Sequence, residues 1–220
     1  MPTAARTGPA RQEARRLGTI ASLMAATLDL LVERGYGGLT MAGVAGRAGV
    51  SRGALTHYYP VKDALVIAAA RHALDEEMAR IARTAPPSGT PAQVFMALLD
   101  ASERFFLAPS FTAHVELSVA ARTAPALGCE YLPMIRAYRT RFDTAWIRAL
   151  MRAGLTPAAA GDLVTMTNHA LRGLGLSACH PDGRQAVPRD LPAIRRRLWL
   201  QLAGDPATPD PMAIDTIGAD

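Results

Sequence analysis

Hydrophobic positions recur with helical spacing along most of the 220-residue chain. Leu17, Ile20, Met24, Leu28 and Leu31 follow one another at intervals of three or four residues, which places them on one face of a helix. The same pattern predicts helices over 41–48, 52–58, 61–83, from 91 onward, 110–121, 131–153, 158–178 and 191–202. No segment alternates between apolar and polar residues in the way that strands do, so the predicted fold class is all-α.

Capping residues and breakers set the expected boundaries of these helices. Thr40, Ser51, Thr90 and Thr156 each precede a helical segment, where a side-chain oxygen can accept hydrogen bonds from free backbone amides. Gly35 is expected to end the first long helix in a left-handed conformation. Residues 180–188 are predicted to form a loop, and the acidic, proline-containing residues 204–220 are predicted to be disordered.

The net charge of +5 lies entirely in the first part of the chain. Residues 1–62 contain eight basic and three acidic side chains, whereas the remaining residues contain 16 of each. A basic end joined to a neutral body is typical of proteins that bind a polyanion, although a solvated basic tail would give the same composition.

Several classes of protein are disfavoured by composition. Cys129 and Cys179 are too few for a disulfide framework, which favours a reducing compartment. The longest weakly polar run, residues 17–32, is shorter than a membrane span, and Asp29 interrupts it where a signal peptide would be apolar. We therefore expect a cytoplasmic protein without a membrane anchor.

The window from residue 41 to residue 58 fits a helix-turn-helix. Val44, Ala45 and Leu55 supply apolar or small positions where two short helices cross, and Gly49 stands where the turn needs a positive φ. In such a motif the second helix enters the major groove, and its early exposed residues meet the bases. Arg52 can read guanine with two hydrogen bonds. The residues expected to contact DNA are Thr40, Arg47, Ser51, Arg52, Gly53, Ala54, Thr56, His57, Tyr58 and Lys62.

Residues 16–66 resemble the N-terminal domain of TetR-family transcriptional regulators. The resemblance rests on LMAA at 23–26, ERGY at 33–36, AGVSRGAL at 48–55 and KDAL at 62–65. Lys62 is the only lysine of the chain and falls at the position of the family's motif lysine. The run Thr56-His57-Tyr58-Tyr59 departs from the family pattern of tyrosine, any residue, histidine and phenylalanine, which puts the phosphate contact expected at Thr56 in doubt.

The resemblance implies a homodimer that binds palindromic double-stranded DNA, usually as a repressor, and a helical body that binds a small-molecule effector. An apolar or aromatic effector is expected, since apolar side chains dominate the candidate pocket. The candidate pocket residues are Phe95, Leu99, Phe111, His114, Tyr138, Phe142, Trp146, Asn168 and His169, although a purely structural role in the core explains each of them as well. The resemblance assigns the last two long helices to the dimer, and the candidate interface residues are Ala170, Gly173, Leu174 and Leu198.

Two short patterns match motifs of other classes without their structural context. Residues 49–53 read G-x-S-x-G, but a hydrolase needs a strand before its serine. Residues 173–178 read G-x-G-x-x-A, but they end a helical stretch instead of following a strand. Cysteine and histidine lack the spacing of a metal site, so neither metal, nor cofactor, nor enzyme activity is predicted.

The sequence thus predicts four segments: a flexible basic extension (1–15), a helix-turn-helix domain (16–62), a ligand-binding and dimerisation domain (63–203) and a disordered tail (204–220). A helical partner-binding or enzyme domain with a non-specific basic N-terminus is the alternative. Base-sequence preference in DNA binding would distinguish the two.

Overall fold

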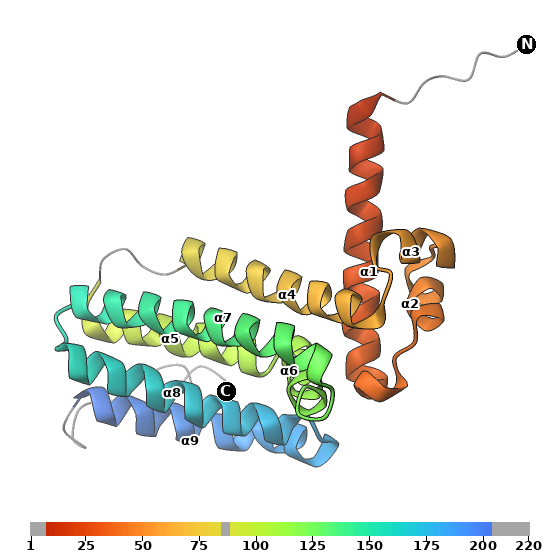
Figure 1. Ribbon diagram of the computed structural model, residues 1–220. Coiled ribbons are helices and arrows are strands. Elements are labelled where there is room, and N and C mark those ends of the chain that lie inside the picture. Colours follow the sequence, from red (N-terminus) through yellow and green to blue (C-terminus); the bar gives the residue numbers. More distant parts are fainter. Residues whose placement is uncertain (1–7, 85–88, 204–220) are drawn as a thin grey trace, which may run out of the picture. The chain divides into compact units, whose positions relative to one another are not determined.

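Every regular element in the described part of the chain is a helix. The computed structural model describes residues 8–84 and 89–203, which contain helices and no strand (Figure 1). The helices are α1 (Pro9–Gly38), α2 (Met41–Ala48), α3 (Arg52–Tyr58), α4 (Lys62–Thr84), α5 (Pro91–Phe106), α6 (Pro109–Ala120), α7 (Pro125–Arg152), α8 (Pro157–Ala178) and α9 (Pro181–Ala203). The predicted all-α class is confirmed. Among the described residues, no helix is both long and apolar enough to cross a membrane. The tail 204–220 lies outside these residues.

The chain divides into two compact units that each contain separate stretches of sequence. The first comprises residues 1–75 and 113–134, and the second comprises residues 76–112 and 135–220. Helices α4, α6 and α7 therefore begin in one unit and end in the other. The boundary predicted after residue 62 does not coincide with the edge of a compact unit, because the N-terminal half of α4 packs with the first unit.

In the first unit, α1 packs on α2 and α2 packs on α3. Leu23 and Leu31 of α1, Val44 of α2 and Leu55 of α3 are fully buried and form the centre of this core. Gly35 interrupts the regular helix with φ 65° and ψ 176°. The positive φ agrees with the prediction, but the helix does not end at Gly35 and its ψ is not that of a left-handed helix. The backbone resumes helical geometry after this kink and reaches Gly38.

Helix α1 begins earlier than the hydrophobic pattern predicted. Residues 9–15, assigned from the sequence to a flexible extension, are helical from Pro9 onward. Residues 11–18 are exposed throughout, so no apolar stripe marks this part of the helix. Proline at the first helical position and good helix formers such as alanine, arginine, glutamine and glutamate explain why it is helical.

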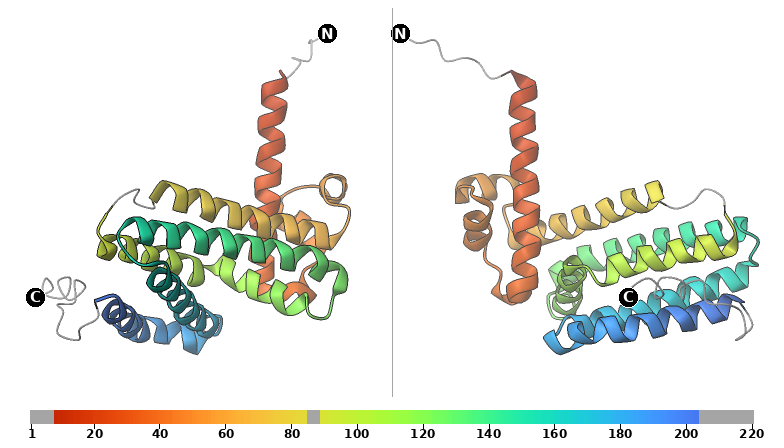
Figure 2. Two further views of the ribbon diagram at one scale, coloured as in Figure 1. Left: turned by 60° about the vertical axis from the view of Figure 1, so that its left-hand side comes forward. Right: turned by 180° about the vertical axis from the view of Figure 1, so that it is seen from behind.

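In the second unit, α8 packs against both α5 and α9, and the two views in Figure 2 show α8 and α9 side by side. At Gly175, α8 approaches the end of α5. A Cβ atom at Gly175 would lie 2.4 Å from the backbone oxygen of Phe106 and 3.0 Å from the ring of Phe111. The absence of a side chain at Gly175 therefore permits this helix contact.

Helix α9 replaces the predicted loop at 180–188. It starts at Pro181 and continues through Pro188 and Pro192, both of which are exposed. Each interior proline removes one backbone donor, which made a break the natural expectation. Continuous helix across both prolines shows that packing against α8 outweighs this local preference.

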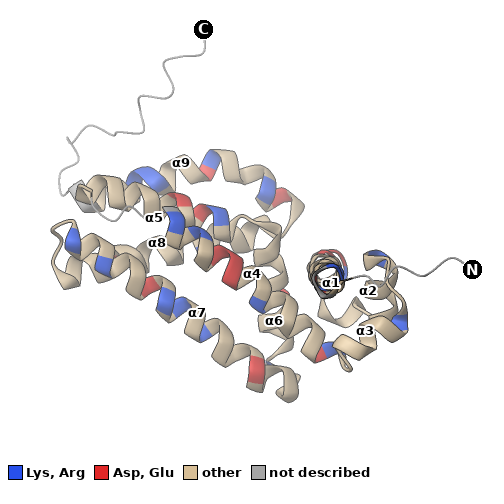
Figure 3. Ribbon diagram, turned by 90° about the horizontal axis from the view of Figure 1, so that it is seen from above, with Lys and Arg blue, Asp and Glu red and all other residues tan. Residues whose placement is uncertain are grey.

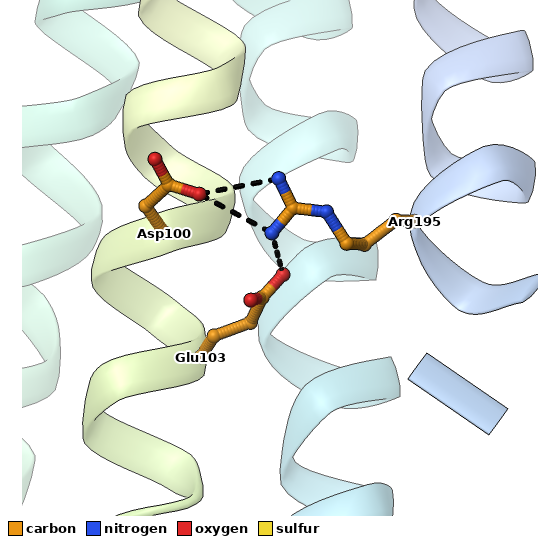
Figure 4. A network of polar contacts seen from close by, with 3 residues as sticks. All are labelled: Asp100, Glu103 and Arg195. Atoms are coloured by element: carbon orange, nitrogen blue, oxygen red, sulfur yellow. Dashed lines mark hydrogen bonds and ion pairs between the residues drawn. The ribbon is translucent and has the colours of Figure 1, made fainter. Parts of the chain in front are cut away.

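Arg195 of α9 binds two acidic residues of α5 (Figure 4). Its guanidinium donates to Asp100 Oδ1 at 3.2 Å and forms a short contact with Glu103 Oε1. The side chains of Arg195 and Glu103 are only 12% and 16% exposed. Burial raises the pKa of Glu103, while the neighbouring Arg195 partly offsets this effect. The network therefore connects α9 to α5, with Arg195 and Glu103 largely buried and Asp100 at the surface.

Candidate nucleic-acid interface

Local hydrogen bonds define the turn between α2 and α3. Thr40 Oγ1 accepts from the Gly43 amide at 3.1 Å, and Ser51 Oγ accepts from the Ala54 amide at 3.1 Å. Gly49 has φ 68° and ψ 28°, a left-handed conformation that side chains other than glycine rarely adopt. The Val50 amide then donates to the Ala45 carbonyl at 3.0 Å and closes the end of α2. Both predicted caps and the predicted glycine turn are confirmed.

Packing of α3 on α2 determines which side chains face outward. Leu55 is fully buried and Ala54 is half-buried, whereas Arg52, Thr56 and His57 are exposed. Gly53 is also exposed, and a Cβ atom placed on it would meet nothing within 4 Å. The outward face of α3 is therefore open to a partner along its first two turns.

Arg52 has a charged side chain that the described residues do not neutralise. It is exposed, and no hydrogen bond or ion pair within the described ranges involves its guanidinium. Thr56 differs, because its hydroxyl donates to the backbone oxygens of Arg52 and Gly53 at 3.0 and 3.2 Å. The ring of the half-buried Tyr58 meets His57 edge-on at 5.4 Å. Arg52 is thus the outward cation on α3.

Arg47 is exposed but already paired. Its two terminal nitrogens bind the two carboxylate oxygens of Glu33 at 2.8 and 2.7 Å, which connects α2 to α1. The hydrogen bonds from Arg47 lower the pKa of Glu33. The sequence indicated Arg47 as a DNA contact and did not reveal that Glu33, 14 residues earlier, would hold it. A phosphate would have to compete with this carboxylate. The basic segments of α1, α2 and α3 are visible in Figure 3.

Lys62, at the start of α4, is held by the end of α1. Its ammonium donates to the Tyr36 carbonyl at 2.5 Å and lies 4.0 Å from the centre of the Tyr36 ring. Partial burial lowers the pKa of Lys62. The Tyr36 hydroxyl donates to Asp63 Oδ1 at 2.5 Å, and burial together with this carboxylate raises the pKa of Tyr36 to about 12. The structure therefore gives Lys62 an anchoring role at the joint between α1 and α4.

Seven of the nine predicted pocket residues are buried in the second unit. These are Phe95, Leu99, Phe111, Tyr138, Phe142, Trp146 and Asn168. Aromatic rings connect several of them, since Phe105 stacks on Tyr138 at 5.3 Å and Phe142 lies 6.3 Å from Tyr138. We refer to Phe105, Phe111, Tyr138, Phe142 and Trp146 as the aromatic cluster. It is built from α5, α6 and α7.

The structure does not place two predicted pocket residues in this cluster. His169 is exposed on α8, one residue beyond the buried Asn168. His114 is buried in the first unit, where its Nδ1 lies 3.2 Å from the Tyr131 hydroxyl. Hydrophobic spacing showed that these residues lie on helices but did not determine which face of the helix each would occupy.

The predicted dimer residues divide between the inside and the outside of the second unit. Leu174 and Leu198 are 6% and 5% exposed and pack within their own chain, so they are not available to a partner. Gly173 is exposed and Ala170 is half-buried. Met166 and Leu176, which were not among the predicted interface residues, are 49% and 45% exposed on α8. The burial of Leu174 and Leu198 within the second unit does not favour a role in the interface, and the dimer interface stays a prediction.

A capped helix-turn-helix with an outward arginine, joined to a larger helical body, defines a regulator of the helix-turn-helix class. Comparison with known proteins specifies the family. A family model described as bacterial regulatory proteins, tetR family, matches residues 23–69. The HTH-type transcriptional regulator CymR of Pseudomonas putida is 32% identical over 182 residues, which cover 81% of this chain and 88% of that protein.

Solved structures show the same fold over most of the chain. A transcriptional regulator from Rhodococcus sp. Rha1 has 27% identity and a TM-score of 0.69, covering 86% of this chain and 99% of its own. A regulator from Saccharomonospora viridis, in complex with choline, has 17% identity and a TM-score of 0.60, covering 81% and 95%. The chain belongs to the TetR family of bacterial regulatory proteins. It is a DNA-binding transcriptional regulator and not an enzyme.

Proposed function

We propose that this regulator is a homodimeric repressor that binds a palindromic operator and releases it when a small molecule enters its second unit. The observation that carries the proposal is the outward face of α3, where Arg52 is exposed without a counter-charge in the described residues and Gly53 leaves open space beside it. An α-helix that presents such a face fits the major groove.

The contacts divide into those that read bases and those that hold phosphates. Arg52 reads guanine, and the early residues Gly53 and Ala54 allow the backbone of α3 to approach the groove. The phosphate contacts come from the exposed Thr40, Thr56 and His57 and from the half-buried Tyr58. Arg47 contacts phosphate only if its ion pair with Glu33 breaks. Lys62 positions α3 by fixing α4 to α1 through Tyr36.

The exposed face of α8 supports the homodimer. Met166, His169, Gly173 and Leu176 recur at intervals of three or four residues and are all exposed. Two large apolar side chains beside a glycine suit close packing against a second copy of the same helix. A two-fold dimer would present two α3 helices to two half-sites, which explains why the operator is expected to be palindromic.

Buried polar atoms in the second unit support an effector site in the aromatic cluster. The Tyr138 hydroxyl, the Trp146 indole nitrogen and the Thr167 hydroxyl have no hydrogen-bond partner within the described part of the chain. Burial, together with Glu77 and Asp143, raises the pKa of Tyr138 far above its usual range, so its hydroxyl stays a hydrogen-bond donor. Unsatisfied groups of this kind cost about 1–3 kcal/mol each. An apolar or aromatic molecule carrying a hydrogen-bond acceptor would satisfy them.

A transcriptional regulator of this fold holds choline, which supports a small-molecule effector for this chain as well. Control of DNA binding then requires that the effector prefers a conformation in which the two α3 helices do not fit adjacent half-sites. Operator affinity can fall by no more than the ratio of the effector's affinities for the two conformations.

The test is a binding titration of the full chain against DNA flanking its own gene, with random duplex as competitor at physiological salt. A preference of about 10³-fold or more for one flanking sequence supports the proposal. If the protein prefers no flanking sequence, bound fragments are selected from a genomic library to find the operator. Absence of any enriched sequence there contradicts operator binding.

A further inference from the structure

The first turns of α1 form a basic helical arm that the core of the first unit does not require. We define the arm as residues 9–18, of which residues 11–18 are all exposed; the first fully buried residue of the helix is Leu23. Figures 1 and 2 show these turns extending beyond α2 and α3. At 1.5 Å per residue, the helix from Arg11 to Leu23 is about 18 Å long. The exposed residues 11–18 of this helix are therefore accessible to a partner.

The charges on the arm favour a polyanion. Arg11 and Arg15 are four residues apart and therefore lie on the same face, where like charges repel each other. No hydrogen bond or ion pair of either guanidinium is present in the described ranges. Arg16 differs, because Glu13 binds it through both carboxylate oxygens at 2.8 and 2.9 Å. The arm thus offers two unneutralised cations on one face.

The arm runs close to the proposed DNA-reading helix. Figures 1 and 2 show α3 beside α1 and the arm continuing α1 past that level. The arm and α3 belong to the same compact unit. A DNA backbone beside the groove that α3 occupies would therefore pass within reach of the arm.

Composition distinguishes DNA from the other possible partners. Leu17 is the only large apolar residue of the arm, so the arm lacks the apolar stripe that a membrane surface or a partner helix would need. Arginine side chains that repel each other in isolation are stabilised when both face phosphates. The chemistry of the arm is therefore that of a phosphate-binding helix.

We propose that Arg11 and Arg15 bind the phosphate backbone next to each operator half-site and add affinity without adding base specificity. This inference rests on the proposed operator binding. Each arm contributes two phosphate contacts, and a dimer contributes four. Counterion release gives a salt dependence of about 0.9 logarithmic units of affinity per logarithmic unit of salt for each contact.

The experiment compares the full-length wild type with the double variant Arg11→Ala/Arg15→Ala between 50 and 200 mM salt, on operator and on random duplex. We expect the magnitude of the salt slope on the operator to fall by about 3.6, with a proportionate loss of affinity on random DNA and an unchanged ratio between the two. Arg11→Lys/Arg15→Lys should restore the slope, since the contact depends on charge. Hydroxyl-radical footprints should lose protection beside the half-site but not within it.

Arg71→Ala/Arg83→Ala removes the same charge from exposed positions of α4 and serves as the matched control. Equal slope changes in both double variants would overturn the proposal, because the effect would then reflect net charge alone. A loss confined to operator DNA would also overturn it, since the arm would then read bases. If the wild type prefers no DNA sequence, operator binding fails, but the salt slope on random DNA still tests the arm.

Discussion

The helix-turn-helix and the aromatic cluster place their polar groups in opposite ways. The motif buries only apolar or small side chains such as Val44, Ala45 and Leu55 and carries Arg52 on its outside. The cluster buries the Tyr138 hydroxyl and the Trp146 indole nitrogen without partners among the described residues. A DNA-binding surface requires a rigid, well-packed core beneath it. A small-molecule site requires buried polar groups whose hydrogen-bond partner is the ligand.

Gly49 of the helix-turn-helix and Gly175 of the second unit are required for different reasons. Substitution of Gly175 has the largest expected effect on the free energy of unfolding. Gly49 is needed for its backbone conformation, whereas Gly175 is needed for space. We expect Gly175→Ala to lower the free energy of unfolding by about 3 kcal/mol, because its Cβ would overlap the Phe106 carbonyl. Gly161→Ala lies on the same helix with nothing within 4 Å and should stabilise the protein by up to about 1 kcal/mol. Chemical denaturation measures both, and equal effects would contradict the packing role of Gly175.

The buried His114 of the first unit is expected to make the free energy of unfolding depend on pH. Burial lowers the pKa of His114 to about 4, whereas an unfolded histidine titrates near 6.5. Between these values the unfolded chain binds a proton that the folded chain does not, so stability falls as the pH falls. We expect a loss from this residue of about 3 kcal/mol by pH 4, measured by denaturant unfolding at several pH values.

His114→Gln should remove this part of the pH dependence, while the exposed His180→Gln should retain it. An unchanged pH profile in His114→Gln would show that the buried imidazole is not the responsible group.

Tyr138→Phe separates an effector-binding role from a structural one. Removal of the unpartnered buried hydroxyl should raise stability by about 1 kcal/mol and leave operator affinity unchanged. If the hydroxyl binds the effector, the concentration of effector that releases DNA should rise roughly tenfold. Effector titrations of the preformed DNA complex measure this concentration. Unchanged effector potency would place the effector site away from Tyr138.

Gly53→Ala tests whether the backbone of α3 approaches DNA closely. The free protein has room for a Cβ there, and alanine in a helix should add up to about 1 kcal/mol of stability. Close approach of the backbone to DNA would nevertheless weaken operator binding. Thermal unfolding and DNA titration on the same sample distinguish the two effects. A variant that is more stable and binds DNA normally would show that α3 does not approach the groove at Gly53.

The features that sequence predicted best depend on local chemistry. Thr40 and Ser51 cap helices through bonds that span three residues, and Gly49 adopts the positive φ that its turn requires. The resemblance to the family around α3 was also recognised from short runs of neighbouring residues. These interactions need no knowledge of which distant segments will meet.

Contacts between distant segments could not be predicted in the same way. The bond from Lys62 to the Tyr36 carbonyl spans 26 residues, and the Arg47–Glu33 pair spans 14. Leu174 and Leu198 were assigned to the outside because a stripe of apolar residues does not reveal which neighbour covers it. The arm of α1 was missed because a helix without an apolar face leaves no periodic signal.

The most direct test of base reading by α3 is the specificity ratio, operator over random duplex, of the wild type and Arg52→Ala at one fixed salt concentration. Two bidentate arginine contacts in a dimer predict that the variant loses about 30-fold or more of this ratio, while its affinity for random DNA falls only slightly. Arg71→Ala, an exposed arginine of α4, should leave the ratio unchanged. An Arg52→Ala variant that loses the same factor on operator and on random DNA would contradict the account.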